Sequence, residues 1–142
     1  MKKIFLVLTL IASAAFITSC EVDHNDFESD RGNTIGFTIP DQDVSINPGQ
    51  TINFPVAYFV TSLSTEDRTF ALEVVAEETE ISADNYSFDS EVVIPAGERK
   101  GTTFFALTNN SLPTEFGALV IQFVQTENTT SGKRAAFRLK SN

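Results

Sequence analysis

Apolar and polar residues alternate along most of this chain from residue 34 onward. The period is two, which is typical of β-strands that bury one face. Regular alternation or a short apolar run marks seven segments: 34–39, 52–60, 69–76, 92–94, 102–107, 119–123 and 135–140. No segment of the sequence has an extended helical period, so the pattern predicts an all-β domain over residues 34–142.

The breaks between these segments contain residues that favour turns. Asn47-Pro48-Gly49-Gln50 has proline and glycine at the second and third positions of a turn, and Pro95-Ala96-Gly97-Glu98 separates two apolar runs. Short strands at this spacing predict an antiparallel β-sandwich of about seven to eight strands. Of the 13 phenylalanines, the 11 that follow Cys20 can supply most of its core. The residues that we expect at its centre are Phe54, Phe70, Ile121 and Phe137.

Pro55 interrupts the alternating run 52–60. Proline has no backbone N–H, so within a sheet it is confined to edge strands, first positions and bulges. We therefore expect the strand that contains Pro55 to lie at a sheet edge. An exposed edge can pair with a strand of a partner protein.

The first 20 residues have the pattern of a signal sequence. Two lysines precede an apolar run over residues 4–17, and small residues lead to Cys20. The run has 14 residues, fewer than the roughly 20 of a membrane-spanning helix, so the pattern favours a signal peptide over residues 1–19. Ile17-Thr18-Ser19-Cys20 resembles a relaxed bacterial lipobox, which implies cleavage before Cys20 and lipid on its thiol. The alternatives are an ordinary secretory signal that contains a cysteine and a transmembrane anchor.

Residues 20–33 predict a flexible tether. Five acids and one base, Arg31, follow Cys20 in this segment, and it contains too little apolar surface to offset the entropy of ordering. Acids soon after a lipidated cysteine are similar to the export signals of Bacteroidota lipoproteins that reach the outer face of the outer membrane. That resemblance implies an outer-membrane lipoprotein exposed at the cell surface.

The charge of the chain excludes one class of partner. All 19 acids follow Cys20 but only 8 of the 10 bases do, so the net charge after cleavage is 8 − 19 = −11. A surface this acidic repels nucleic acid and anionic lipid headgroups. We expect no nucleic-acid partner.

The sequence offers few groups for catalysis. His24 is the only histidine, and a flexible tether cannot hold it within reach of a substrate proton. Cys20 is the only cysteine, and its lipidation would leave no thiol nucleophile. A pair of carboxylates could serve glycoside cleavage, but no serine-hydrolase or phosphate-binding motif is present. We expect a protein that is not an enzyme and that uses no cofactor.

Three consecutive segments, 81–88, 92–98 and 102–107, resemble the middle of a Calx-beta domain. In that family a small residue and an Asp-Tyr pair precede a strand, a Pro-x-Gly-Glu turn and a second strand. The segments are also similar to β-sandwich domains of small Bacteroidota lipoproteins found with polysaccharide-uptake systems. The resemblance covers about residues 66–124 and implies an immunoglobulin-like sandwich, with Tyr86 packed inside and Gly97 in a tight hairpin.

The same resemblance raises the question of calcium, which Calx-beta domains bind through acids at one end of the sandwich. Asp84 is the best positional match, although Asn85 separates it from Tyr86. The acid-rich loop of the family corresponds to residues 109–115, where Glu115 is the only acid. Asp84 and Glu115 are therefore the candidate ligands. We expect no metal site, with a calcium-binding Calx-beta-like domain as an alternative.

A glycan site usually needs exposed aromatic side chains. The chain has no tryptophan, and its two tyrosines, Tyr58 and Tyr86, are expected to face the core. The candidates for exposed rings are Phe27, Phe59, Phe105 and Phe116. The sequence leaves a glycan ligand open without supporting one.

These features together predict a lipid-anchored envelope protein that binds or scaffolds without catalysis. We expect an accessory of an outer-membrane system, with polysaccharide uptake as one setting and a protein partner in the same membrane. The alternative is a structural spacer or interaction module without a small ligand.

Overall fold

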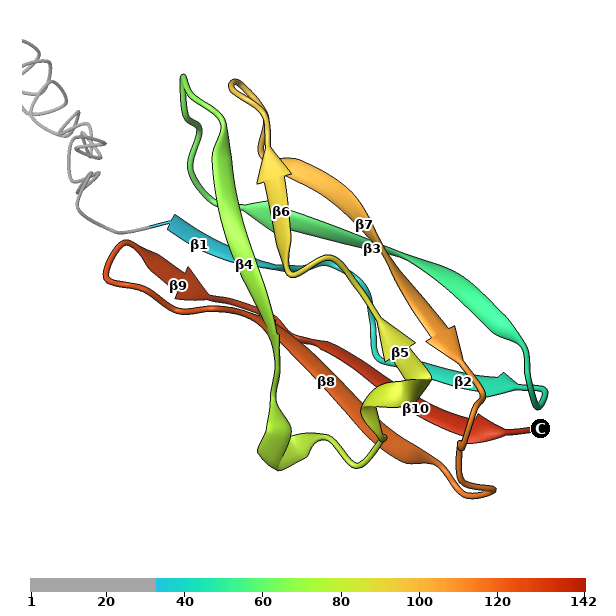
Figure 1. Ribbon diagram of the computed structural model, residues 1–142. Coiled ribbons are helices and arrows are strands. Elements are labelled where there is room, and N and C mark those ends of the chain that lie inside the picture. The colour runs from blue at the N-terminus through green and yellow to red at the C-terminus, as the bar shows by residue number, and fades with distance from the viewer. Residues whose placement is uncertain (1–32) are drawn as a thin grey trace, which may run out of the picture. The chain divides into compact units, whose positions relative to one another are not determined.

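The computed structural model describes residues 33–142, which form two five-stranded β-sheets packed as a sandwich (Figure 1). Sheet 1 consists, in spatial order, of β5 (Tyr86–Ser87), β7 (Lys100–Thr108), β3 (Thr51–Val60), β1 (Asn33–Phe37) and β9 (Thr129–Ser131). Sheet 2 consists of β2 (Gln42–Ile46), β10 (Ala135–Ser141), β8 (Gly117–Phe123), β4 (Arg68–Val74) and β6 (Glu91–Ile94). Two short 3₁₀ helices, η2 (Ala76–Glu78) and η3 (Ala83–Asn85), lie between β4 and β5.

The all-β sandwich expected from the sequence is confirmed, but it has ten strands rather than seven to eight. The three strands that the alternation does not predict are β2, β5 and β9. They are short, and β9 is Thr-Thr-Ser, which has no apolar side chain. Such strands form because a neighbouring strand offers free backbone groups for pairing. Backbone pairing places little demand on side chains, so the sequence of a short strand shows no clear pattern.

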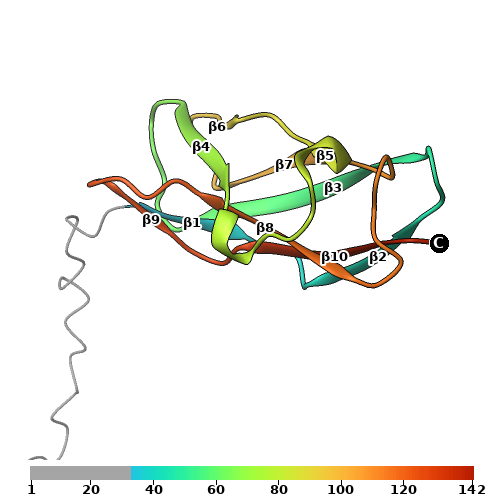
Figure 2. The ribbon, with the colours of Figure 1, turned by 60° about the horizontal axis from the view of Figure 1, so that its bottom comes forward.

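Two strand pairs depart from the antiparallel arrangement that the sequence predicts for the sandwich. β1 pairs with β9 in parallel, and β2 pairs with β10 in parallel. The cause is that the chain leaves sheet 1 after Phe37 and enters sheet 2 at Gln42, so that one N-terminal segment adds a strand to each layer (Figure 2). Both strands then meet C-terminal strands that run in the same direction.

The strand that contains Pro55 is not an edge strand, which corrects the sequence prediction. β3 lies between β7 and β1 in the middle of sheet 1. Its pairing with β1 covers only Tyr58 to Val60. Beyond it, the N–H of Thr38 donates a hydrogen bond to the carbonyl of Ala57 at 2.9 Å. Backbone groups of alternate residues face the same neighbour, so the nitrogen of Pro55 faces the side that β1 has already left. The missing N–H therefore breaks no hydrogen bond.

Both predicted glycine turns are present. Gly49 and Gly97 have φ angles of 78° and 80°, which glycine adopts without steric cost. The N–H of Gln50 donates to Asn47 and that of Glu98 donates to Pro95, each at 3.0 Å. Gly97 thus lies in a tight turn between β6 and β7, but these strands belong to different sheets and are not paired, so the turn does not close the hairpin that the resemblance implied.

Phenylalanine rings from both sheets form the centre of the core. Phe37 and Phe105 of sheet 1 and Phe123 and Phe137 of sheet 2 are each at most 2% exposed. The rings of Phe37 and Phe123 stack with centroids 4.7 Å apart, and those of Phe105 and Phe137 are 5.9 Å apart. Phe54 is only partly buried and packs edge-on against Phe137.

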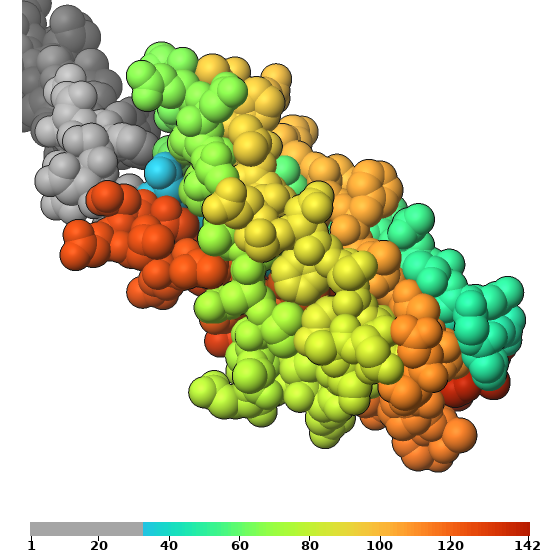
Figure 3. Space-filling view, in the orientation of Figure 1, coloured from blue at the N-terminus to red at the C-terminus, as the bar shows by residue number. Residues whose placement is uncertain are grey.

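One side of the sandwich is closed by contact between β6 and β7. The hydroxyl of Tyr58 crosses from β3 and donates to the carbonyl of Val93 in β6 at 3.5 Å. In the space-filling view of Figure 3, the green-to-yellow atoms of β4 to β6 meet the orange atoms of β7. This closure joins the edge of sheet 2 to sheet 1.

Several sequence predictions concern residues outside the described part of the chain. They are the signal peptide over 1–19, the lipidation site Cys20, His24, Phe27 and all but the last residue of the tether over 20–33. β1 begins at Asn33, the last position of that predicted tether. No helix within residues 33–142 is long and apolar enough to cross a membrane.

Candidate binding site

The two sheets differ strongly in charge. Residues 33–142 contain 14 acids, yet none of them lies on a strand of sheet 1. The only charged residue in the five strands of sheet 1 is Lys100. The strands of sheet 2 carry six charged residues: Asp43, Arg68, Glu73, Glu91, Arg138 and Lys140.

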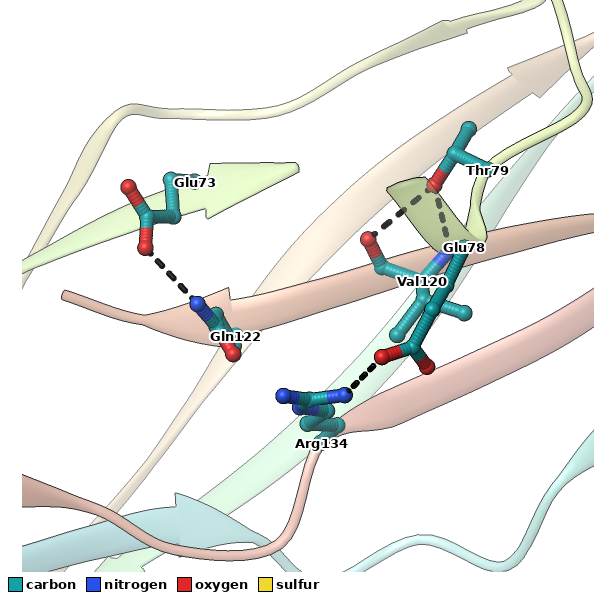
Figure 4. A network of polar contacts seen from close by, with 6 residues as sticks. All are labelled: Glu73, Glu78, Thr79, Val120, Gln122 and Arg134. Atoms are coloured by element: carbon teal, nitrogen blue, oxygen red, sulfur yellow. Dashed lines mark hydrogen bonds and ion pairs between the residues drawn. The ribbon is translucent and has the colours of Figure 1, made fainter. Parts of the chain in front are cut away.

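The charges of sheet 2 are largely used within the protein. Arg138 donates to Asp43, which fixes β10 to β2, and this hydrogen bond holds the pKa of the Asp43 carboxyl below its usual range. Glu78 pairs with Arg134, and Gln122 donates to Glu73 at 2.8 Å, as Figure 4 shows. The outer face of sheet 2 is therefore a charged surface on which several polar groups have partners within the protein.

The outer face of sheet 1 is apolar and rich in hydroxyl groups. We define the β3–β7 face as the side chains that point outward from two facing segments, 55–59 of β3 and 100–104 of β7: Pro55, Ala57, Phe59, Lys100, Thr102 and Phe104. Phe104 is 60% exposed and Phe59 is 38% exposed. Surfaces that expose aromatic rings beside a few polar groups are typical of binding sites.

A hollow of about 500 Å³ lies on this face. It forms where β1 leaves sheet 1 after Phe37, because the departing chain leaves one side of β3 uncovered. Its lining residues are Thr38, Ala57, Tyr58, Phe59, Glu98, Lys100, Gly101 and Thr102.

The lining of the hollow combines an apolar floor with hydrogen-bonding groups. Ala57 and Thr102 are cross-strand partners and are small, whereas the ring of Phe59 stands beside them. The hydroxyl of Thr102, the amino group of Lys100 and the carboxylate of Glu98 supply donors and acceptors. This chemistry suits a ligand that has both apolar surface and hydroxyl groups, and it includes no nucleophile with an adjacent base.

Tyr58 supports the floor of the hollow from the inner side of sheet 1. Tyr58 is 4% exposed and lies opposite Gly101 in the pairing of β3 with β7. Burial raises the pKa of its hydroxyl above the usual value. The phenol therefore stays neutral and keeps its hydrogen bond to Val93.

Asp84 and Glu115, the candidate metal ligands, do not form a cluster of acids. Asp84 lies in η3, where its carboxylate accepts hydrogen bonds from the hydroxyl of Ser111 at 2.9 Å and the amide of Asn85 at 3.0 Å. Glu115 is an exposed residue of the β7–β8 loop. Among residues 33–142, no three acids, histidines or cysteines are close enough together to hold a metal ion.

The resemblance implied that Tyr86 is packed inside, but the fully buried residue of this segment is its neighbour Asn85. Asn85 is 1% exposed, whereas Tyr86 is only partly buried and stacks on Phe88. The side-chain oxygen of Asn85 accepts the N–H groups of Asn110 and Ser111 at 3.0 and 2.9 Å. Asn85 thereby ties η3 to the β7–β8 loop through hydrogen bonds.

The exposed rings are partly those expected. Phe59 and Phe116 are each 38% exposed, but Phe105 is fully buried and Phe104 takes the outward position. Two adjacent phenylalanines in a strand must face opposite sides, and the run 102–107 alone does not show which faces inward. Phe116 contacts Arg138 and Lys140, whose charged groups lie 5.1 and 4.9 Å from its ring centroid.

No protein-family model matches the chain, and no curated protein matches its sequence. The apo-form Calx CBD1 domain has a similar structure, with a TM-score of 0.57 and 13% identity over 78% of this chain and 98% of that one. Residues 33–142 of this chain therefore have a Calx-beta-like fold.

Two Bacteroides ovatus structures share the fold. One is a multidomain protein including DUF1735, with a TM-score of 0.58 and 15% identity over 76% of this chain and 45% of that one. The other is a proposed carbohydrate-binding protein, with a TM-score of 0.60 and 14% identity over 75% of this chain and 36% of that one. The chain spans less than half of the length of either protein, and identities this low show the fold alone.

Proposed function

We propose that this protein is a lipid-anchored, non-catalytic accessory of an outer-membrane system that binds carbohydrate through the β3–β7 face. The observation that carries the proposal is the contrast between the sheets. Sheet 1 has no acid on its strands, and its β3–β7 face exposes Phe59 beside the hollow and Phe104 two positions beyond Thr102. The strands of sheet 2 instead carry several charged residues, among them the ion pair of Asp43 with Arg138.

Carbohydrate is favoured because of the kind of groups on this face. Sugars present hydroxyl groups at their edges and C–H groups on their ring faces, which suit the hydroxyls and aromatic rings around the hollow. The fold shared with a proposed carbohydrate-binding protein of Bacteroides ovatus supports this class of ligand. The hypothesis that a protein partner adds a strand beside Pro55 is not supported, because β3 lies in the middle of sheet 1.

The binding face can be tested by photocrosslinking in cells. Phe104→benzoylphenylalanine places a photoreactive group on the β3–β7 face, and the same change at Phe116 places it beside sheet 2. We expect position 104 to give a crosslinked species that contains carbohydrate and that position 116 does not give. Equal crosslinking from both positions, or none from position 104, would contradict the proposal.

The membrane anchor is the second part of the proposal. We propose that Cys20 becomes the diacylated N-terminus, because two acyl chains anchor a protein stably whereas one gives only marginal binding. Cys20→Ser should abolish labelling with radioactive fatty acid and leave the uncut precursor. Mass spectrometry that finds an unmodified Cys20 in the membrane fraction would overturn this part of the proposal. Protease accessibility on intact cells tests the proposed exposure at the cell surface.

A structural spacer is the second candidate function. The start of β1 and the C-terminal residue lie at opposite ends of the sandwich (Figure 1), so the domain would add its whole length to a tether. Replacing residues 33–142 with an unrelated β-sandwich of similar length distinguishes the two functions. A spacer would tolerate the exchange, whereas a binding accessory would lose its ligand.

A further inference from the structure

The β3–β7 face has two raised rings separated by a low segment. Phe104 lies opposite Pro55 and Phe59 lies opposite Lys100 in the register of the two strands. Pro55 and Phe59 are four residues apart, which is about 14 Å along a strand, and an even spacing keeps both on one face. The pair between them, Ala57 and Thr102, has small side chains.

The face is thus an open surface along the strands with one ring near each end, rather than a closed pocket. A single pyranose ring is about as wide as a phenyl ring, so it covers Phe59 or Phe104 but not both. A chain of several sugars that runs parallel to β3 can stack on both rings and place its hydroxyls near Thr102 and Lys100. The contacts are thus distributed along the ligand.

The charge of the face limits the ligand further. Lys100 is the only cation on it, and Glu98 lines the same hollow. A net charge of −11 after Cys20 repels polyanions over the whole molecule. A ligand without charge meets no such repulsion and avoids the cost of burying an unpaired ion.

We propose that the ligand is a neutral oligosaccharide in an extended conformation, held along β3 and β7 by stacking on both Phe59 and Phe104. This inference rests on the proposed function, because it uses the same face and adds the class and length of the sugar. Lys100 then acts as a hydrogen-bond donor to hydroxyl groups rather than as the partner of a carboxylate.

Native affinity electrophoresis of the mature, detergent-solubilised protein tests the inference. The gels contain starch, xyloglucan, galactomannan or yeast mannan as neutral polymers, and polygalacturonate as an anionic one. We expect at least one neutral polymer to slow migration and polygalacturonate to have no effect. Phe59→Ala and Phe104→Ala should each weaken binding by about tenfold or more.

Phe116→Ala is the matched control, since Phe116 is as exposed as Phe59 and lies away from the face. It should bind like the unchanged protein, and unchanged melting temperatures show that the variants are folded. Oligosaccharides cut from the bound polymer should compete better than the corresponding monosaccharide by tenfold or more.

The contrary outcomes separate this inference from the proposed function. Retardation by polygalacturonate alone, or equal competition by a monosaccharide, overturns the neutral extended ligand and leaves a carbohydrate site in place. Retardation that survives both Phe59→Ala and Phe104→Ala overturns the two-ring site. No retardation by any polymer, together with a crosslinked protein at position 104, overturns both.

Discussion

The phenol ring of Tyr58 lies directly against the α-carbon of Gly101 on the inner side of sheet 1. A Cβ added at position 101 would be 2.5 Å from Cζ of Tyr58, closer than any normal contact. The two residues are cross-strand partners, and the Tyr58 hydroxyl continues to Val93 of β6. The absence of a side chain at position 101 thus lets one tyrosine join β3, β7 and β6 beneath the β3–β7 face.

Gly101→Ala should destabilise the protein. The added methyl group must displace a ring that is held by the core, and overpacking of this kind typically costs about 1–3 kcal/mol. Denaturant unfolding monitored by circular dichroism measures the loss. Thr102→Ala, one residue along and facing outward, is the control and should change the free energy of unfolding far less. Equal stability of Gly101→Ala and the unchanged protein would show that Tyr58 can move freely.

Asn85→Ala should also destabilise the fold, although it removes no apolar group. The change leaves the N–H groups of Asn110 and Ser111 without the oxygen that they bind, and losing an ordinary hydrogen bond typically costs about 0.5–1.5 kcal/mol. Thermal melting checks this loss. Asn53→Ala, at an exposed position on β3, should melt like the unchanged protein. If Asn85→Ala does so too, the link between η3 and the β7–β8 loop contributes nothing to stability.

The ion pair of Asp43 with Arg138 predicts a loss of stability in acid. The hydrogen bond from Arg138 lowers the pKa of Asp43 in the folded protein. The unfolded chain therefore takes up the proton first, so the contribution is present above the ordinary pKa of about 3.9 and is lost as the pH falls through the lower value.

Asp43→Asn should reduce stability at neutral pH and flatten its decline in acid. Denaturant unfolding from neutral pH down to about pH 3, below the ordinary pKa of aspartate, measures both effects. Both side chains of the pair are exposed to solvent, so added salt should weaken the difference. Parallel curves for the two proteins across this range would contradict the prediction.

Calcium should leave the stability of this protein unchanged. A ligand that binds the folded state raises the melting temperature with its concentration, but Asp84 is bound by Ser111 and Asn85 in place of an ion. Melting in about 1 mM calcium, a concentration to which weak extracellular sites respond, should match melting in chelator. An upward shift that Asp84→Ala abolishes would establish a calcium site at η3.

Elements that depend on neighbouring residues were predictable from the sequence. Alternation or a short apolar run predicted seven of the ten strands, because a strand with one buried face needs apolar residues at regular short intervals. Gly49 and Gly97 marked two turns, since those turns require the positive φ that glycine adopts readily. The resemblance over residues 66–124 correctly implied a Calx-beta-like sandwich.

The face that each strand buries and the neighbour with which it pairs depend on tertiary contacts. Phe104 and Phe105 are equally apolar, and only the pairing of β7 with β3 turns Phe105 to the core and Phe104 to solvent. The strand that contains Pro55 is central rather than an edge strand, because β1, from a separate part of the chain, pairs with one end of β3. The candidate site exists for the same reason, since the hollow lies where β1 crosses to sheet 2. Such relationships depend on contacts between residues far apart in the sequence, which local patterns do not encode.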